Sequence, residues 1–291
     1  MKDIGEVIKL MRKSKGLTLK QLSKAGISVP FLSKVENNHS HLSSVALFKL
    51  TDFLNLELEE AEDIYHTYTD RHARYTFFTQ LQEAVQEKDV YLLNELVKEQ
   101  KKKYTETHNV RHFHGKILAE AYINYVSKLP NNLTYRKILT DYLWSIPYWS
   151  MYELQLFSNS LPILHLHDCH KLLQSLNSNN RLFYMNRERT TRTIIKIKLN
   201  MLLKHLAENE LENLAVLLKQ LEKELHGTSF YNSKNKLHFI KGVYLIKTGH
   251  KEQGQQLCKR AIEIMYDLDD PANAHIYQEE LHHLLAKTEQ T

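Results

Sequence analysis

Residues 17–38 read Leu-Thr-Leu-Lys-Gln-Leu-Ser-Lys-Ala-Gly-Ile-Ser-Val-Pro-Phe-Leu-Ser-Lys-Val-Glu-Asn-Asn, and this stretch decides the fold. Thr18 and Ser28 each stand one residue before a short helical pattern, where a hydroxyl can accept hydrogen bonds from the unpaired amides of a helix's first turn. Gly26 can form the turn between the two patterns. Pro30 falls in the first turn of the second helix, where its missing amide costs little. The stretch therefore predicts two short helices joined by a tight turn, the arrangement of a helix-turn-helix.

The second of these helices has an apolar side and a free side. Leu32 and Val35, with Leu22 of the first helix, supply the apolar contacts, which leaves the other face available for the major groove of DNA. Two short helices around a glycine also occur in proteins that never bind DNA. Here, however, residues 28–37 (Ser-x-x-x-Leu-Ser-Lys-Val-Glu-Asn) resemble the second and third helices of the XRE family of repressors, in which the second helix of the motif reads DNA. The residues predicted to contact DNA are Thr18, Lys20, Ser28, Val29, Pro30, Phe31, Ser33, Lys34, Asn37 and Asn38.

The positive charge of the chain is concentrated at its start. The net charge is only +5, yet residues 1–49 carry nine Lys or Arg and three acids, which is +6. Residues 50–66 then hold six acids and no base. Charge runs are usually solvated faces, but this basic block coincides with the helix-turn-helix, so neutralisation of DNA phosphates is the better explanation. The predicted partner is a double-stranded DNA operator.

Composition excludes several other classes of protein. Gly and Pro together number 13 of 291 residues, which favours long helices over turn-rich folds. No apolar run approaches the ~20 residues that span a bilayer, the first residues lack the apolar core of a signal peptide, and Cys169 and Cys258 are the only cysteines. We therefore expect a cytoplasmic protein that does not contact membranes. Phosphate-binding loops and hydrolase motifs are missing, so we expect no enzymatic activity and no cofactor.

The chain is long enough for two domains, each with its own core. We predict five helices within residues 1–66, forming the DNA-binding domain, and a helical connector at residues 67–76. Residues 77–291 are then the regulatory and dimerisation domain. In the first helix the apolar residues follow the i, i+3, i+4, i+7 spacing, which places Arg12 on the outside.

Small residues in the C-terminal part of the chain indicate a repeat. Gly242, Gly249, Gly254 and Ala261 fall at offsets 0, 7, 12 and 19, the spacing of the small positions in a tetratricopeptide repeat. Small residues at these positions allow paired helices to approach closely. A second clean copy is absent. The predicted fold class is all-α, with the five-helix XRE-type domain followed by a right-handed α-solenoid of tetratricopeptide-like helix pairs.

Residues 141–160 hold both tryptophans and four other aromatic residues. At helical spacing such side chains usually pack between helices, so we expect Trp144, Tyr152 and Phe157 in the core. By contrast, we expect His112 and His114 at the surface.

The same aromatic segment carries a family resemblance. Tyr-Leu at residues 142–143, Trp-x-x-Tyr-Glu-Leu at 149–154 and Leu-Phe-x-Asn at 156–159 resemble the Rgg/GadR/MutR regulators, which join an XRE-type helix-turn-helix to a helical repeat domain. The resemblance implies a cytoplasmic, homodimeric transcription regulator of the quorum-sensing type. Many relatives bind a short signalling peptide on the concave face of the repeats. Some link their subunits through a cysteine in the DNA-binding domain, which this chain lacks. RNA polymerase is a further candidate partner.

Peptide capture also makes demands that can be applied to the residues themselves. An extended peptide leaves its amides and carbonyls unpaired, and an asparagine side chain can pair with both. Asn159 and Asn200 are candidates, since each interrupts an apolar helical neighbourhood. Stacking, or a clamp on a terminal carboxylate, is predicted for Tyr184, Arg187, Arg192 and Tyr231. For each of these residues a surface or capping role is an equal alternative.

Two other interpretations remain open at this point. Residues 165–170 (His-Leu-His-Asp-Cys-His) could place two metal ligands on one helix face, but structural zinc needs four ligands and no second cluster completes the set, so no metal site is predicted. The helical domain could also receive a protein partner or a small ligand instead of a peptide. An open groove with paired asparagines would favour a peptide, and a closed apolar cavity would favour a small molecule.

Overall fold

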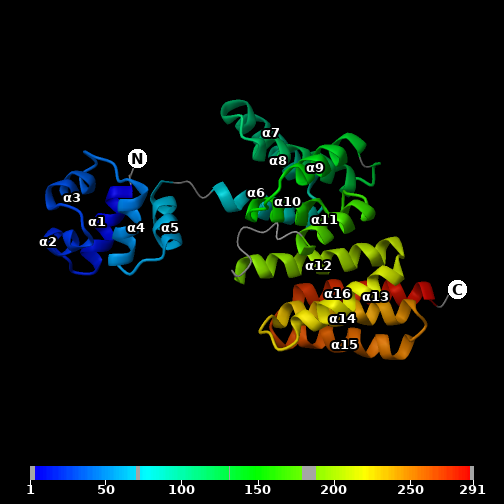
Figure 1. The fold of residues 1–291 in the computed structure, drawn as a ribbon. Coiled ribbons are helices and arrows are strands. Elements are labelled where there is room, and N and C mark those ends of the chain that lie inside the picture. Colours follow the sequence, from blue (N-terminus) through cyan, green and yellow to red (C-terminus); the bar gives the residue numbers. More distant parts are fainter. Residues whose placement is uncertain (1–3, 70–72, 131, 179–187, 289–291) are drawn as a thin grey trace. The chain divides into compact units, whose positions relative to one another are not determined.

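The computed structural model describes residues 4–69, 73–130, 132–178 and 188–288. Within these ranges the regular structure is helical and contains no β-strand, which confirms the predicted all-α class. The chain forms two compact units, Met1–Glu83 and Ala84–Thr291 (Figure 1). The predicted domain limits at residues 66 and 77 stay a prediction.

The first unit is a small helical bundle. Its helices are α1 (Ile4–Ser14), α2 (Leu19–Leu22) with a 3-10 turn at Ser23–Ala25, α3 (Val29–Glu36), α4 (Ser44–Phe53), α5 (Leu58–Thr69) and most of α6 (Ala73–Gln86). The centre of its core has no exposed surface and consists of Ile8, Leu22, Leu32, Leu50 and Leu54. Because α1, α2, α3 and α4 each supply part of this cluster, the two motif helices are fixed by the two helices that flank them.

Local turn chemistry sets the bounds of the motif helices. Thr18 Oγ1 accepts a hydrogen bond from the Gln21 amide at 3.2 Å, while the Gln21 side chain accepts one from the Thr18 amide at 2.8 Å. Gly26 has a φ of 84°, in the left-handed region that favours glycine. Ser28 holds the N-cap position of α3, but its hydroxyl makes no capping bond. That part of the prediction is wrong, and one contributing reason is that Pro30 has no amide hydrogen to donate.

A buried ion pair joins α1 to α3. Arg12 is 9% exposed and Glu36 is 3% exposed. The Arg12 Nε and Nη2 atoms donate to the two carboxylate oxygens of Glu36 at 2.6 and 2.7 Å, and Nη1 donates to the Leu17 carbonyl at 2.6 Å. The hydrogen bond to Glu36 raises the pKa of Arg12. The prediction that Arg12 lies outside is therefore wrong, because helical spacing takes no account of an acid on another helix.

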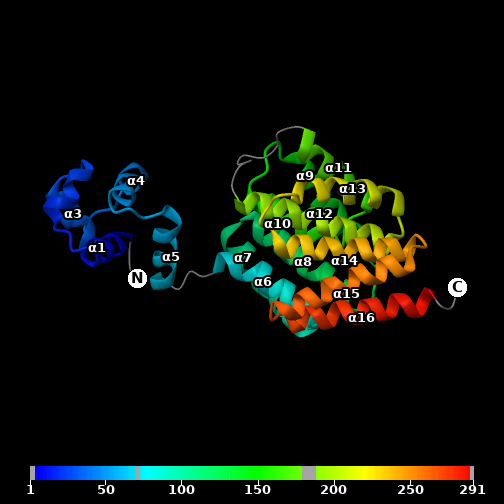
Figure 2. The same cartoon turned by 90° about the horizontal axis from the view of Figure 1, so that it is seen from below.

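The second unit is built largely of helix pairs. Consecutive helices lie side by side, most extensively α14 with α15 and α7 with α8, followed by α15 with α16 and α12 with α13 (Figures 1 and 2). The helices are α7 (Val90–Thr107), α8 (Val110–Val126), α9 (Leu133–Ser145), α10 (Met151–Ser160), α11 (Leu166–Ser178), α12 (Glu188–Glu208), α13 (Leu211–Leu225), α14 (Tyr231–Lys247), α15 (Lys251–Asp267) and α16 (Pro271–Thr288).

The small residues noted in the sequence permit the tightest of these pairings. A Cβ at Gly254 would lie 2.5 Å from the Gly242 carbonyl oxygen, and a Cβ at Gly242 would lie 2.7 Å from that of Gly254. Only glycine fits at such a backbone-to-backbone crossing of α14 and α15. Gly249 forms the turn between them with a φ of 92°, and Ala261 is fully buried. The predicted tetratricopeptide-like packing of residues 242–261 is confirmed.

The aromatic segment is only partly as expected. Phe157 is buried, but Trp144 is 38% exposed and Trp149 takes the core position, where its Nε1 donates to the Leu143 carbonyl at 3.1 Å. The reason is that Leu143, next to Trp144, already occupies the inward side at the end of α9. His114 is also buried, against the surface expectation, and its Nδ1 lies 2.8 Å from the Tyr152 hydroxyl.

Removal of one partner from the buried ion pair should weaken the first unit. A Glu36→Gln variant leaves the Arg12 guanidinium buried without a counter-charge, and we expect the free energy of unfolding of this unit to fall by about 3–5 kcal/mol. Hydrogen exchange of the α1 and α3 amides in the full chain measures that value. The matched control is Glu95→Gln, which breaks the exposed pair with Lys98 and should cost under ~1 kcal/mol. Equal exchange in the two variants contradicts the assignment.

Buried histidines should make the second unit sensitive to acid. Burial lowers the pKa of His114 and of His205 from 6.5 to about 4. Between these values the unfolded chain binds more protons than the folded chain, so stability is full above pH 6.5 and falls towards pH 4, by on the order of 2–3 kcal/mol for each histidine. Urea unfolding followed by tryptophan fluorescence reports this unit alone, since both tryptophans lie in it. His205→Leu should reduce the pH dependence, whereas the exposed His282→Leu should not.

Candidate nucleic-acid interface and binding hollows

The α3 helix shows the division between faces that its sequence predicted. Leu32 and Val35 are buried against the core, while Ser28, Val29, Pro30 and Lys34 are exposed, and Phe31 and Ser33 are half-buried. The exposed residues cluster at the N-terminal end of the helix. In a helix-turn-helix this end contacts base edges, so Ser28 to Phe31 have the best position for that contact. Lys34 lies one turn further on, where a lysine suits a phosphate.

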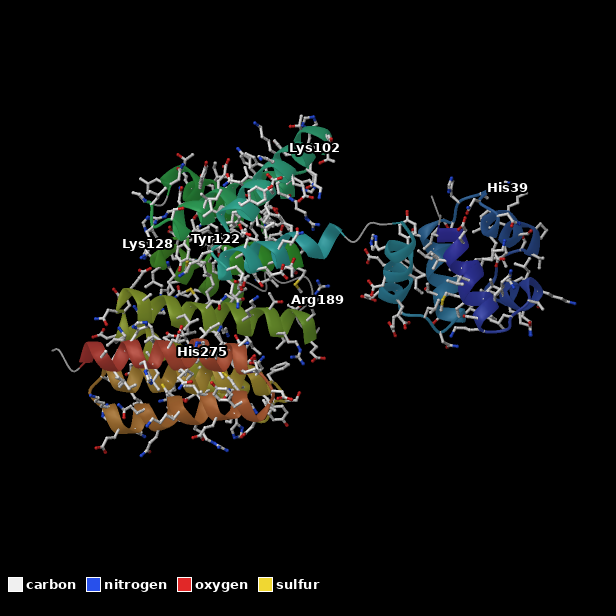
Figure 3. All side chains as sticks on the ribbon, turned by 180° about the vertical axis from the view of Figure 1, so that it is seen from behind. His39, Lys102, Tyr122, Lys128, Arg189 and His275 are labelled. Carbon is white, nitrogen blue, oxygen red and sulfur yellow. The ribbon has the colours of Figure 1, made fainter. Side chains whose placement is uncertain are left out.

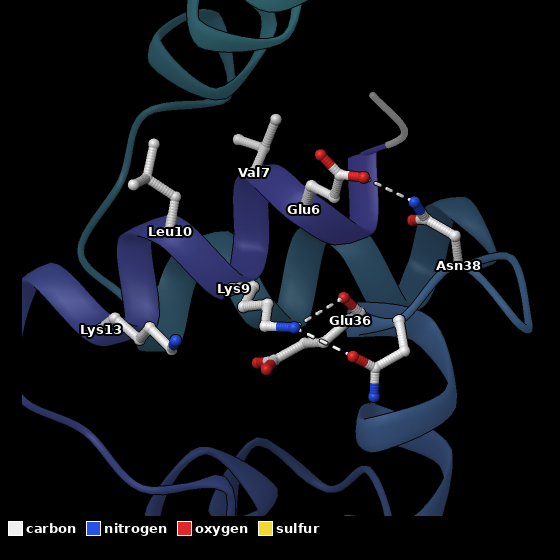
Figure 4. A pocket seen from close by; sticks show the side chains of 8 residues that line it. Glu6, Val7, Lys9, Leu10, Lys13, Glu36 and Asn38 are labelled. Carbon is white, nitrogen blue, oxygen red and sulfur yellow. Dashed lines mark hydrogen bonds between the residues drawn. The ribbon is translucent and has the colours of Figure 1, made fainter. Parts of the chain in front are cut away.

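The other end of α3 is bound to α1. The Lys9 ammonium donates to Asn37 Oδ1 at 2.9 Å, and Asn38 Nδ2 donates to Glu6 Oε1 at 2.7 Å (Figure 4). These contacts border a hollow of about 470 Å³, which we call the α1–α3 hollow. Both asparagines are exposed, but their side chains already have partners within the unit. The structure thus places them apart from Ser28 to Phe31, and their contact with DNA stays a prediction.

The start of α2 supplies the remaining predicted contacts. Thr18 is exposed and its hydroxyl is engaged in the cap with Gln21, whereas Lys20 is exposed on the helix itself. Lys49 belongs to the basic block of residues 1–49 but is not among the predicted DNA contacts. The structure places its ammonium beside the turn, 4.0 Å from where a Cβ at Gly26 would lie. A base near the turn adds to the positive charge that attracts phosphates, and the signal in the sequence was the basic block itself.

The second unit contains a hollow of about 820 Å³, which we call the α12 hollow. Four helices and the turn after α10 surround it, and it is partly open to solvent. Its lining is mainly apolar but also includes charged side chains, which suits a ligand with both apolar side chains and backbone polar groups. The lining residues are Tyr125, Leu161, Pro162, Asn200, Leu203, Lys204, Leu206, Ala207, Glu208, Val243, Lys247, Glu280, His283 and Leu284.

Of the residues predicted to bind a peptide, Asn200 lines this hollow. Asn159 does not line it. That side chain is buried, and its Nδ2 donates to the Gln155 carbonyl of the same helix at 2.7 Å. Tyr184 and Arg187 lie outside the described residues. The role of all four in binding stays a prediction.

Arg192 and Tyr231 lie at the other end of α12. Arg192 pairs with Glu188 at 2.5 Å, and its guanidinium lies 4.7 Å from the centre of the Phe230 ring. Tyr231 is 71% exposed, with the Lys234 ammonium 5.5 Å from its ring centre. A second, shallower hollow of about 550 Å³ is found here, which we call the basic hollow; it is lined by Glu188, Arg189, Arg192, Thr193 and Lys196.

The histidine-rich segment at residues 165–170 is spread over different environments. His165 is exposed and contacts Arg136, with 3.0 Å between its Nε2 and the arginine Nη1. Cys169 is buried, and the ring of His170 lies 4.6 Å from that of His205. Among the described residues, no three His, Cys, Asp or Glu side chains gather as a metal site would need. In the same part of the chain, no helix is long and apolar enough to cross a membrane.

Two family models match the chain. The model for "HTH-type transcriptional regulator Rgg, C-terminal domain" matches residues 94–279, and the model for "Helix-turn-helix" matches residues 8–60.

Solved structures share the fold over nearly the whole chain. The SHP pheromone receptor Rgg2 of Streptococcus dysgalactiae has a TM-score of 0.76 at 19% identity, covering 97% of this chain and 99% of that one. A protein of Listeria monocytogenes EGD-e has a TM-score of 0.82 at 22% identity, covering 98% of both chains. PrgX in complex with cCF10 has a TM-score of 0.72 at 17% identity, covering 99% of this chain and 94% of that one. At these identities the likeness establishes the fold.

The position of Ser33 and Lys34 on the free side of α3 generates a test. We expect the double variant Ser33→Ala, Lys34→Ala to lose sequence-specific DNA binding, and the loss of Lys34 to reduce the dependence of log affinity on log salt by ~1. The measurement is the affinity of the full chain, across a salt series, for a duplex selected by the wild type from a random library. Lys259→Ala, which removes an exposed lysine of α15, is the control. Unchanged affinity in the double variant contradicts the groove assignment.

Proposed function

Because the chain belongs to the Rgg family of helix-turn-helix transcriptional regulators, we propose that a short signalling peptide bound in the α12 hollow changes how the protein binds its operator or activates a promoter. The first unit reads DNA through α3, and the second unit receives the effector. The observation that carries the proposal is the α12 hollow, which is partly open, has mixed polarity and contains Asn200.

The solved relatives support a peptide as the effector. Rgg2 is named as a receptor for the SHP pheromone, and PrgX has been solved with cCF10 and with iCF10. A further structure of this fold is described as a bacterial peptide pheromone/receptor complex. The shape of the α12 hollow favours a peptide over a small molecule, since a small molecule would be better enclosed by a closed apolar cavity.

Further parts of the proposal follow from the same family. We propose that the protein acts in the cytoplasm as a homodimer, because one recognition helix reads only a few base pairs and two copies supply a half-site spacing of roughly one helical turn, ~34 Å. We propose no catalytic activity, and RNA polymerase remains a candidate contact. The two thiols are free and buried, which fits subunits held together without a disulfide.

One experiment tests the effector and the dimer together. The full chain is mixed with a synthetic library of random octapeptides, and a native mass spectrum records the subunit number and the peptides bound. We expect a dimer carrying peptide, and we expect the selected peptides to change the affinity for the selected DNA duplex at least ~fivefold. An absence of bound peptide, or bound peptides that leave DNA affinity unchanged, contradicts the proposal.

Within the hollow, Asn200 is expected to pair with the peptide backbone. Asn200→Ala should weaken binding of the selected peptides by about tenfold without loss of helicity, since an asparagine makes up to two hydrogen bonds of ~1 kcal/mol each in such a contact. Titration calorimetry measures the affinity. Asn94→Ala is the matched control, because Asn94 is exposed on α7 and donates to the Val90 carbonyl of its own helix. An affinity equal to that of the control removes Asn200 from the site.

A further inference from the structure

The N-terminal end of α3, which reads DNA in the function proposed above, is apolar. Val29, Pro30 and Phe31 are the first three residues of the helix. Val29 is 36% exposed, Pro30 is exposed and Phe31 is half-buried. The other end of the helix runs into the loop that holds His39 (Figure 3). Arg, Lys, Asn and Gln, the side chains that read a base through two hydrogen bonds, are absent from residues 27–33.

The backbone and the helical spacing strengthen this apolar character. Pro30 has no amide hydrogen, so the backbone cannot donate at that position. A helical period of 3.6 residues places Pro30 and Lys34 in the middle of the exposed side, opposite the buried Leu32. Val29 and Phe31 then lie at the two edges of that side. The surface that enters the groove first therefore presents three apolar side chains together.

Polar groups without partners border this apolar surface. The hydroxyls of Ser28 and Ser33 and the ammonium groups of Lys20 and Lys34 form no hydrogen bond or ion pair within the described parts of the chain. A partner that fits must therefore be anionic around an apolar centre. The major groove of DNA has this chemistry wherever it contains thymine, because the C5-methyl group of thymine lies among the base edges and phosphates flank it.

We propose that Val29, Pro30 and Phe31 read the operator through the C5-methyl groups of thymine, so that the operator carries thymines where the N-terminal end of α3 enters the major groove. This rests on the DNA-reading role proposed for α3 and adds the class of base that it recognises. Ser28 and Ser33 add single hydrogen bonds to neighbouring base edges, since a hydroxyl can both donate and accept.

Deoxyuridine is the probe, because uracil keeps every hydrogen-bonding group of thymine and lacks only the methyl group. The wild-type full chain first selects a duplex from a random library, and each thymine of that duplex is then replaced in turn. Fluorescence anisotropy of the labelled duplexes measures the affinity. The variants are Val29→Ala, Pro30→Ala and Phe31→Ala, and the matched control is Val216→Ala, at a valine of α13 that is 60% exposed. Hydrogen exchange of the α1 and α3 amides checks that each variant keeps its fold.

We expect deoxyuridine to weaken wild-type binding about fourfold at one or more positions, the factor that ~0.8 kcal/mol for a buried methyl gives at ~1.4 kcal/mol per factor of ten. The effect at a sensitive position should fall below ~twofold in at least one of the three α3 variants and persist in Val216→Ala, as a double-mutant cycle requires of a direct contact. At the same position, 5-methylcytosine paired with guanine should bind more tightly than cytosine paired with guanine, since it restores the methyl group.

The outcomes separate this inference from the role on which it rests. If the wild type binds its selected duplex specifically but binds every deoxyuridine duplex equally well, methyl reading is overturned and the DNA-reading role stands. A deoxyuridine effect that survives in all three α3 variants also overturns it, because the methyl group then acts through the shape of the DNA. If the wild type selects no sequence from the library, the DNA-reading role and the methyl reading fail together.

Discussion

The carboxylate of Glu36 lies inside the first unit, where an unpaired charge would cost several kcal/mol. It is stable there because Arg12 meets both of its oxygens while also donating to the Leu17 carbonyl at the start of the motif. One guanidinium thus joins α1, the loop before α2, and the last turn of α3. A Cβ at Gly5 would lie 2.1 Å from the Val35 carbonyl oxygen, so α1 and α3 are also in direct backbone contact. These two contacts orient α3 and thereby set the direction in which its exposed N-terminal residues point.

The second unit depends on a comparable constraint of a different kind. Where α14 crosses α15, Gly242 and Gly254 bring one backbone against the other, with no side chain between them that could change its rotamer. Such a pair is stiff, because packed backbones have few alternative arrangements. A ligand against α14 therefore acts on the pair as a whole. Any signal from the α12 hollow is expected to travel as a displacement of intact helices, since tightly packed pairs move as rigid bodies.

The fold could be predicted from the sequence wherever the pattern is local. The cap at Thr18, the turn at Gly26, and the small residues at 242–261 depend on spacing within a few turns of helix. The errors arose where a side chain's partner lies far away in the chain. Helical spacing predicts Arg12 on the outside, because Glu36, which neutralises it, is 24 residues later in the chain. The surface position predicted for His114 is wrong for the same reason, because Tyr152, its partner, is 38 residues later in the chain.

The candidate site was predictable to a lesser degree, for the same reason. Asn200 could be named because it interrupts an apolar helix, and it lines the α12 hollow. Asn159 satisfied the same rule, yet its amide bonds within its own helix.

The two sides of α12 also bear on how such a chain can diverge. Ile195, Leu199 and Leu202 are buried, whereas Arg192, Lys196 and Asn200 line hollows and keep contact with solvent. Substitutions on the hollow side alter ligand contacts at little cost in stability, since surface changes are usually within ±0.5 kcal/mol. Recognition can therefore drift to a new effector while the scaffold stays intact. Two solved structures share this fold at 19% and 22% identity, so the scaffold is retained while most of the sequence changes.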